Sequence, residues 1–72
     1  MRTFTAYLEW DPETNLYVGF VPGIPGAHTQ GRSLDELQKN LKEVLGLCLE
    51  EYQDAGEDLP RFVGLQQIEV VG

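Results

Sequence analysis

The first part of the chain alternates apolar and polar positions with the period of a β-strand. Within residues 3–10 one face is apolar and the other mixed, as expected for a half-buried strand. The apolar face carries Phe4, Ala6, Leu8 and Trp10. Turn-forming residues at 11–15 separate this strand from a second one at 16–21. After a corner rich in Pro and Gly at 22–26, a short third strand is predicted at 27–30.

From Leu34 onwards the hydrophobic spacing changes to three and four, which predicts an amphipathic helix from Leu34 to about Asp54. Ser33 and Glu36 form a capping box at its start, because the Ser33 hydroxyl can accept the amide of Glu36 and the carboxylate can reach back. Cys48 falls within the apolar positions and is expected in the core. A last strand is predicted within residues 65–71.

The element order is therefore βββαβ, in a single domain that covers residues 1–72. A right-handed crossover through the helix would place the last strand beside the first. The expected fold class is α+β, with a mainly antiparallel four-stranded sheet in the order 3-2-1-4 and one helix on one face. One helix about 10 Å wide cannot cover four strands spaced about 4.8 Å apart. The other face, with Tyr7, Tyr17 and Val21, is therefore expected to be an oligomer face.

Composition narrows the choice of partners. The chain has 72 residues, with 5 Lys and Arg against 12 Asp and Glu, which gives a net charge of −7. Such a charge repels phosphate, so no nucleic acid is expected to bind this chain alone, and a basic protein is the better match. A chain this short barely offsets the entropy of folding, which again favours a homodimer or higher homo-oligomer.

Several chemistries have too few residues to support them. The single cysteine, Cys48, excludes an internal disulfide framework and a Cys-cluster zinc site, and one His cannot build a His-rich metal site. We expect no cofactor and no enzymatic activity. No apolar run approaches the roughly 18 residues of a membrane span, and the amino-terminal residues lack the apolar region of a signal peptide. These features favour a cytoplasmic protein without a membrane partner.

The segment from Tyr17 to Leu45 contains an ordered set of short motifs. They are the aromatic strand at Tyr17, a Pro-x-x-Pro-Gly corner at 22–26, Thr-Gln-Gly at 29–31, the capping box of Ser33 and Glu36, and Asn-x-x-Glu at Asn40 and Glu43. In this order they resemble the HicB-like antitoxin family, whose domain is similar to a truncated RNase H sheet. Each motif is common alone, but the ordered set is specific.

The resemblance implies a binding partner rather than a reaction. Antitoxins of this family bind and block a small basic toxin that is similar to a double-stranded RNA-binding domain and cleaves messenger RNA. A net charge of −7 suits a protein that covers a basic surface, since complementary charge speeds encounter. We expect a short form of the family, without the carboxy-terminal DNA-binding domain that many members carry.

Two groups of residues are candidates for contact with such a toxin. At 100° per residue, a line of acidic residues lies opposite the apolar side of the helix, with one leucine among them. This group comprises Glu36, Glu43, Leu47, Glu50 and Asp54. The second group is Glu9, Trp10 and Asp11, at the end of the first strand. An ordinary solvated helix face with one exposed leucine would show the same pattern as the first group.

Two other functions remain open. A metal-dependent nuclease or hydrolase on an RNase H-like sheet needs several carboxylates around two metal ions about 4 Å apart. Glu9 and Asp11 could supply two of them, and Asp35 or Glu36 more. Because Glu36 belongs to the capping box and the other two flank a turn, we expect no catalytic or metal site. The remaining alternative is an orphan structural domain without a toxin partner.

Overall fold

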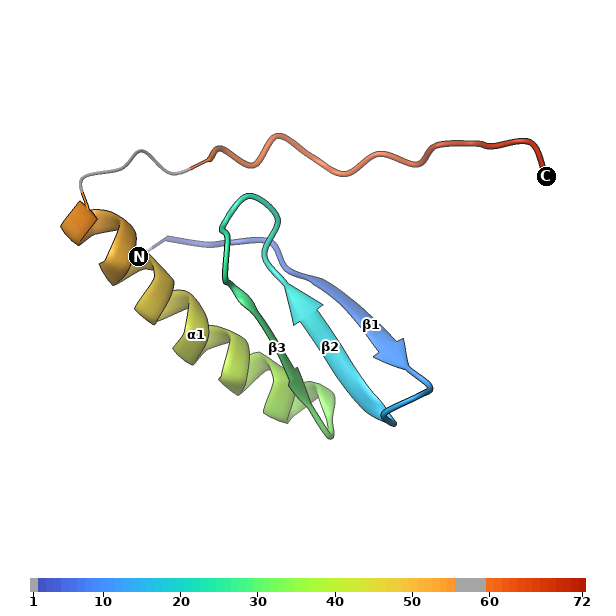
Figure 1. Cartoon of the computed structure of the whole chain (residues 1–72), viewed down its shortest axis with the longest axis horizontal. Helices are drawn as coiled ribbons and strands as arrows, with labels where there is room; N and C mark the ends of the chain where they lie inside the picture. The colour runs from blue at the N-terminus through green and yellow to red at the C-terminus, as the bar shows by residue number, and fades with distance from the viewer. Residues whose placement is uncertain (1, 56–59) are drawn as a thin grey trace.

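Three antiparallel strands and one helix make up the folded part of the chain (Figure 1). The computed structural model describes residues 2–55 and 60–72. The elements are β1 (Tyr7–Asp11), β2 (Leu16–Phe20), β3 (His28–Gly31) and α1 (Leu34–Ala55). The sheet order is β1-β2-β3. The three amino-terminal strands and the helix are confirmed. However, β1 begins later than predicted, and Phe4 and Ala6 pack against the core without being in a strand.

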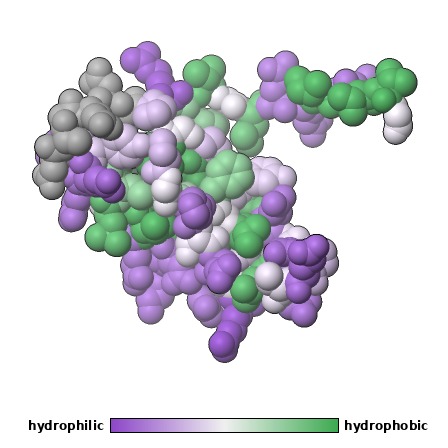
Figure 2. Space-filling model, in the orientation of Figure 1, coloured by the Kyte–Doolittle hydropathy of each residue, from purple (hydrophilic) through white to green (hydrophobic). Residues whose placement is uncertain are grey.

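The predicted fourth strand is wrong. Residues 60–72 form no strand in the structure, and Figure 1 shows them as an extended segment that projects beyond the sheet. Within the described residues the sheet therefore has three strands, not four in the order 3-2-1-4. Alternating β-branched residues favour an extended backbone, but a strand also needs a hydrogen-bonding neighbour. Among the described residues, no strand pairs with residues 60–72. Figure 2 shows hydrophobic side chains of this segment on the surface.

The hairpin between β1 and β2 is set by the side chain of Asp11. Its Oδ1 accepts a hydrogen bond from the amide of Glu13 at 3.0 Å, and its Oδ2 accepts one from Thr14 Oγ1 at 2.9 Å. Asn15 closes the turn at a φ of 58°, a left-handed conformation that Asn tolerates better than most residues. The turn pairs Asp11 with Leu16 and so fixes the register of the whole hairpin.

The register assigns each side chain to one of two sheet faces, because directly paired residues share a face. The face toward α1, called the helix face, carries Leu8, Trp10, Tyr17, Gly19, Thr29 and Gly31. The opposite face, called the open face, carries Tyr7, Glu9, Asp11, Leu16, Val18, Phe20, His28 and Gln30. The helix packs on β2 and β3, so the helix face is less covered at β1.

Glycines on the helix face let α1 approach the sheet closely. A Cβ at Gly19 would lie 3.1 Å from Leu41 Cδ1 and 3.3 Å from Leu37 Cδ2. A Cβ at Gly31 would lie only 2.6 Å from the backbone nitrogen of Leu37. Next to this contact, Asn40 Nδ2 donates a hydrogen bond to the carbonyl oxygen of Gln30 at 2.8 Å. The Thr-Gln-Gly and Asn-x-x-Glu motifs therefore meet where β3 and α1 pack together.

The core is small and lies between the helix and the Pro-Gly corner. Its buried residues are Val21, Ile24, Ala27, Leu37, Leu41 and Cys48, which confirms the expected place of Cys48. The radius of gyration is 14.0 Å, against roughly 11 Å for a compact chain of this length. The projecting segment accounts for the difference. Within the described ranges, no helix combines the length and the apolar character needed to cross a bilayer.

Candidate functional site

The outer side of α1 presents acidic side chains around one exposed leucine. We call this the acidic helix face and define it by Glu36, Glu43, Leu47 and Glu50, all of which are exposed. The side chain of Leu47 is 66% exposed. Asp54 lies in the last turn of the helix, but its side chain is outside the described part of the structure. The structure thus brings four of the five predicted helix residues onto one surface.

The orientation of this face follows from how the helix begins and packs. Ser33 Oγ accepts the amide of Glu36 at 3.1 Å, which confirms the cap that starts the helix. Leu37 and Leu41 are buried against the sheet, so the opposite side of the helix must face solvent. The Asn40–Gln30 hydrogen bond fixes the rotation of the helix about its axis. The acidic helix face is therefore presented by a well-fixed element.

Gly46 adds a feature that the apolar pattern does not explain. It lies in mid-helix, where Gly costs about 1 kcal/mol relative to Ala. A Cβ at this position would meet no atom within 4 Å, so packing inside the chain does not require a glycine. Gly46 follows Glu43 by three residues and precedes Glu50 by four, which places it at the margin of the acidic helix face. Here the helix backbone is open to close approach from outside.

The second predicted group does not form one surface. Glu9 and Asp11 lie on the open face, whereas Trp10 lies on the helix face. Trp10 packs edge-on against Tyr17, with ring centroids 4.9 Å apart. Both carboxylate oxygens of Asp11 accept hydrogen bonds within the turn, so its role is structural. Successive residues of a strand point to opposite faces of the sheet, so the sequence alone already indicated that Trp10 lies apart from Glu9 and Asp11.

The predicted grouping of Tyr7, Tyr17 and Val21 also differs from the structure. Tyr7 lies on the open face, where its ring centroid is 5.4 Å from that of Phe20. Tyr17 lies on the helix face, and Val21 is buried in the core beyond the end of β2. A turn that pairs Asp11 with Leu16 necessarily pairs Tyr7 with Phe20. Counting across that turn would have identified Phe20 instead.

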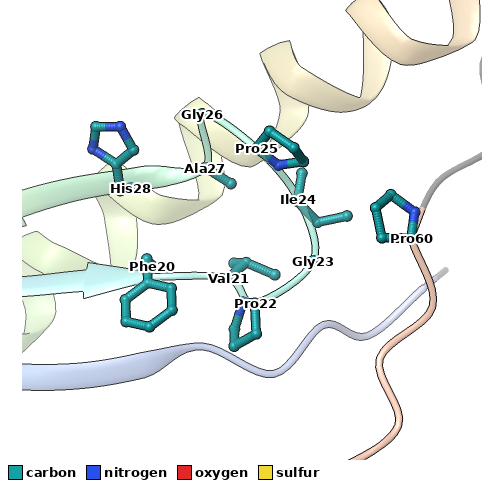
Figure 3. A pocket seen from close by; sticks show the side chains of 10 residues that line it. All are labelled: Phe20, Val21, Pro22, Gly23, Ile24, Pro25, Gly26, Ala27, His28 and Pro60. Carbon is teal, nitrogen blue, oxygen red and sulfur yellow. The ribbon is translucent and has the colours of Figure 1, made fainter.

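A shallow apolar pocket of about 510 Å³ lies at the Pro-Gly corner (Figure 3). Its lining residues are Phe20, Val21, Pro22, Gly23, Ile24, Pro25, Gly26, Ala27, His28 and Pro60. His28 is the only titratable side chain in this lining. A pocket with this lining suits apolar contact rather than acid–base chemistry, which requires positioned proton donors and acceptors.

The carboxylates considered for a nuclease do not form a metal site in the described part of the chain. Across residues 2–55 and 60–72, no three His, Cys, Asp or Glu side chains lie close enough together to hold a metal ion. Both carboxylate oxygens of Asp11 accept hydrogen bonds within the hairpin turn. The acidic helix face is therefore the better candidate for function.

Comparisons with known proteins show which family the chain resembles. No family model matches it, and no solved structure matches it. A UPF0150 protein of Thermotoga maritima is 55% identical over 71 residues, which cover 96% of this chain and 91% of that protein. UPF0150 proteins of Archaeoglobus fulgidus and a Synechocystis species are 42% and 39% identical, with at least 93% of each chain covered. The chain thus belongs to the UPF0150 protein family.

Proposed function

We propose that this protein is an antitoxin-like binding protein that neutralises a small basic mRNA-cleaving toxin by covering its surface. The observation that carries the proposal is the acidic helix face, with Leu47 exposed among carboxylates on a fixed helix. The HicB-like motif set between Tyr17 and Leu45 supports the same function. A toxin that cleaves messenger RNA acts in the cytoplasm, which is therefore the compartment that this function implies.

Charge supports a basic partner. Residues 34–55 contain six acidic and two basic side chains, within a chain whose net charge is −7. A field of one sign speeds the encounter with an oppositely charged protein and disfavours partners of like charge. A toxin that holds RNA needs a basic surface for phosphates. A helix of carboxylates that occupies this surface would exclude RNA without any chemical step.

Leu47 and Gly46 add an apolar anchor and a close approach to the helix backbone, neither of which charge provides. Protein interfaces gain most of their affinity from a few buried anchors near the centre, surrounded by a polar rim. Leu47 has acidic residues on both sides along the helix and is 66% exposed, so a partner could bury it. Gly46 leaves the adjacent backbone uncovered, which permits a closer approach than any other residue would.

The experiment first searches the neighbouring genes for a short reading frame that encodes a basic protein, and it uses the product of that frame as the probe. RNA cleavage by this product is measured while the wild-type chain is added up to an equimolar amount. We expect cleavage to stop near a ratio of one to one. If no such basic protein is encoded there, or if cleavage continues with the chain in excess, the proposed function is wrong.

A charge-reversal variant tests the surface separately. The double variant Glu43→Lys with Glu50→Lys should bind the probe at least about tenfold more weakly. The matched control is Glu13→Lys, which makes one of the same Glu-to-Lys changes in the exposed turn between β1 and β2. Its affinity for the probe should stay within about twofold of the wild-type affinity. If the double variant binds as tightly as wild type, the acidic helix face is not the contact surface, although the binding function stands.

A further inference from the structure

The carboxy-terminal segment exposes more apolar surface than a folded monomer normally tolerates. Within residues 63–71, five large apolar side chains are between 68% and 107% exposed. They are Val63, Leu65, Ile68, Val70 and Val71. Figure 2 shows hydrophobic and hydrophilic residues side by side along the projecting segment. Single exposed apolar residues need no explanation, but several of them close together are typical of an interaction site.

The two edges of the sheet differ in a way that matters for this segment. The outer edge of β3 faces α1, and the Gln30 carbonyl there accepts a hydrogen bond from Asn40. Within the described residues, β1 pairs only with β2, so its outer edge is free. Unpaired N–H and C=O groups on an edge strand form a template for another extended chain. The free edge is therefore β1.

Apolar side chains at this free edge are half exposed on both faces of the sheet. Leu8 and Trp10 are 46% and 47% exposed on the helix face. Tyr7 and Phe20 are each 44% exposed on the open face. A strand that covered this edge would need apolar side chains pointing in both directions.

We propose that residues 65–71 of a second copy of this chain add to the β1 edge, and that the exchange is reciprocal. The result is a twofold-symmetric dimer in which each sheet gains its fourth strand from the partner. The proposal concerns self-association and does not rest on the proposed function. Addition of a strand to a free edge is a common mode of recognition, with affinity from main-chain hydrogen bonds and specificity from alternate side chains.

The alternation of the segment matches the two faces at β1. Ile68 and Val70 point to the same side of an extended strand. Placing them beside Leu8 and Trp10 buries apolar surface on the helix face. The same placement puts Leu65 and Val71 on the open face, beside Tyr7 and Phe20. Gln67 and Glu69 then lie on the open face, where polar side chains remain accessible to water. A strand that is apolar on both faces suits this edge.

A second copy is the occupant that the geometry favours. Pro60 and Phe62 lie beside residues 3–5 and Pro22 at one end of the domain, and beyond them the segment leads away from the sheet (Figure 1). A projecting segment can reach another molecule, and a closed twofold exchange buries two such segments at once. Because the core of a single chain is small, the apolar surface buried by the exchange contributes a large share of the stability of the dimer.

The first experiment measures mass in solution by sedimentation of the full-length chain. We expect twice 8.1 kDa for the wild type. The double variant Ile68→Asp with Val70→Asp should sediment as one chain, with its helical circular dichroism retained. The control, Gln67→Asp, adds an acidic charge at a position of the segment that lies on the open face and stays accessible to water, and it should remain a dimer. A monomeric wild type, or a dimer that survives Ile68→Asp with Val70→Asp, overturns the proposal.

The second experiment does not depend on how that variant folds. Chains with Leu8→Cys are mixed with differently tagged chains that carry Cys at position 66, 68 or 70, and then oxidised. We expect a disulfide between the two kinds of chain at one or more of these positions, and far less with Cys at 67 or 69. A chain with both Leu8→Cys and Ile68→Cys that instead closes a disulfide within itself, at the mass of one chain, overturns the exchange.

Discussion

The side-chain amide of Asn40 donates a hydrogen bond to the backbone carbonyl of Gln30 at 2.8 Å. This bond links the first half of α1 to the outer edge of β3. It fixes how the helix is rotated over the sheet, and it also occupies a main-chain acceptor at one edge of the sheet. Both consequences bear on function, because the rotation sets where the acidic helix face points and the occupied edge leaves β1 as the free one.

Replacing Asn40 by Ala should lower the free energy of unfolding by about 0.5–1.5 kcal/mol, because the hydrogen bond to the Gln30 carbonyl is lost. Urea unfolding followed by circular dichroism measures this change. Gln38→Ala, at an exposed position two residues away, should change stability by less than about 0.5 kcal/mol. Equal effects of the two variants would show that the Asn40 hydrogen bond does not tie the helix to the sheet.

Gly31→Ala should destabilise the protein by about 2–3 kcal/mol, as overpacking of a close contact does. The added Cβ would lie 2.6 Å from the Leu37 nitrogen and 2.9 Å from its Cα, and helix backbone cannot move aside as a side-chain tip can. Gly64→Ala, where nothing lies within 4 Å, is the control and should be nearly neutral. Thermal unfolding compares the two, and similar melting temperatures would contradict the close packing of α1 on β3.

Gly46→Ala should have opposite effects on folding and on binding. The isolated chain should gain about 1 kcal/mol of stability, because Ala favours the helix and the site is open. Affinity for the basic partner should fall, because the methyl group keeps the partner from the helix backbone. Chemical unfolding and calorimetric titration measure the two effects. A more stable variant with unchanged affinity would exclude Gly46 from the contact.

Leu47→Ala should weaken partner binding by about tenfold or more, as loss of an interface anchor does. The stability of the isolated chain should change by less than about 0.5 kcal/mol, since this side chain is 66% exposed. Leu34→Ala, at a half-exposed position in the first turn of the same helix, is the matched control and should bind like wild type. A comparable loss of affinity in both variants would argue against Leu47 as the anchor.

Local patterns in the sequence were sufficient to predict the parts of the fold that local chemistry determines. The Ser33 cap starts the helix where expected, and the turn chemistry at Asp11 and Asn15 gives the hairpin. The strand predicted at 65–71 failed for another reason. Its side chains favour an extended backbone, but pairing depends on a neighbouring edge, and no local pattern specifies whether that edge belongs to the same chain.

The candidate site also combines features that local sequence patterns predict with features that depend on strand pairing and packing. Helical periodicity placed Glu36, Glu43, Leu47 and Glu50 on one exposed surface, because that placement needs only the helix and its buried side. Tyr7, Tyr17 and Val21 do not share one face, since the face on which a strand residue lies depends on the register across the hairpin. That register was available by counting from Asp11 and Leu16, whereas the burial of Val21 depends on the Pro-Gly corner folding over the core.

The most direct measurement is the affinity of the basic partner for the wild-type chain and for Glu43→Lys with Glu50→Lys, across salt from roughly 50 mM to about 500 mM. If the protein works by covering a basic surface with its acidic helix face, wild-type affinity should fall steeply with salt. The variant should start weaker and show a much flatter dependence. Wild-type affinity that does not change with salt, or the same slope for both proteins, would contradict this function.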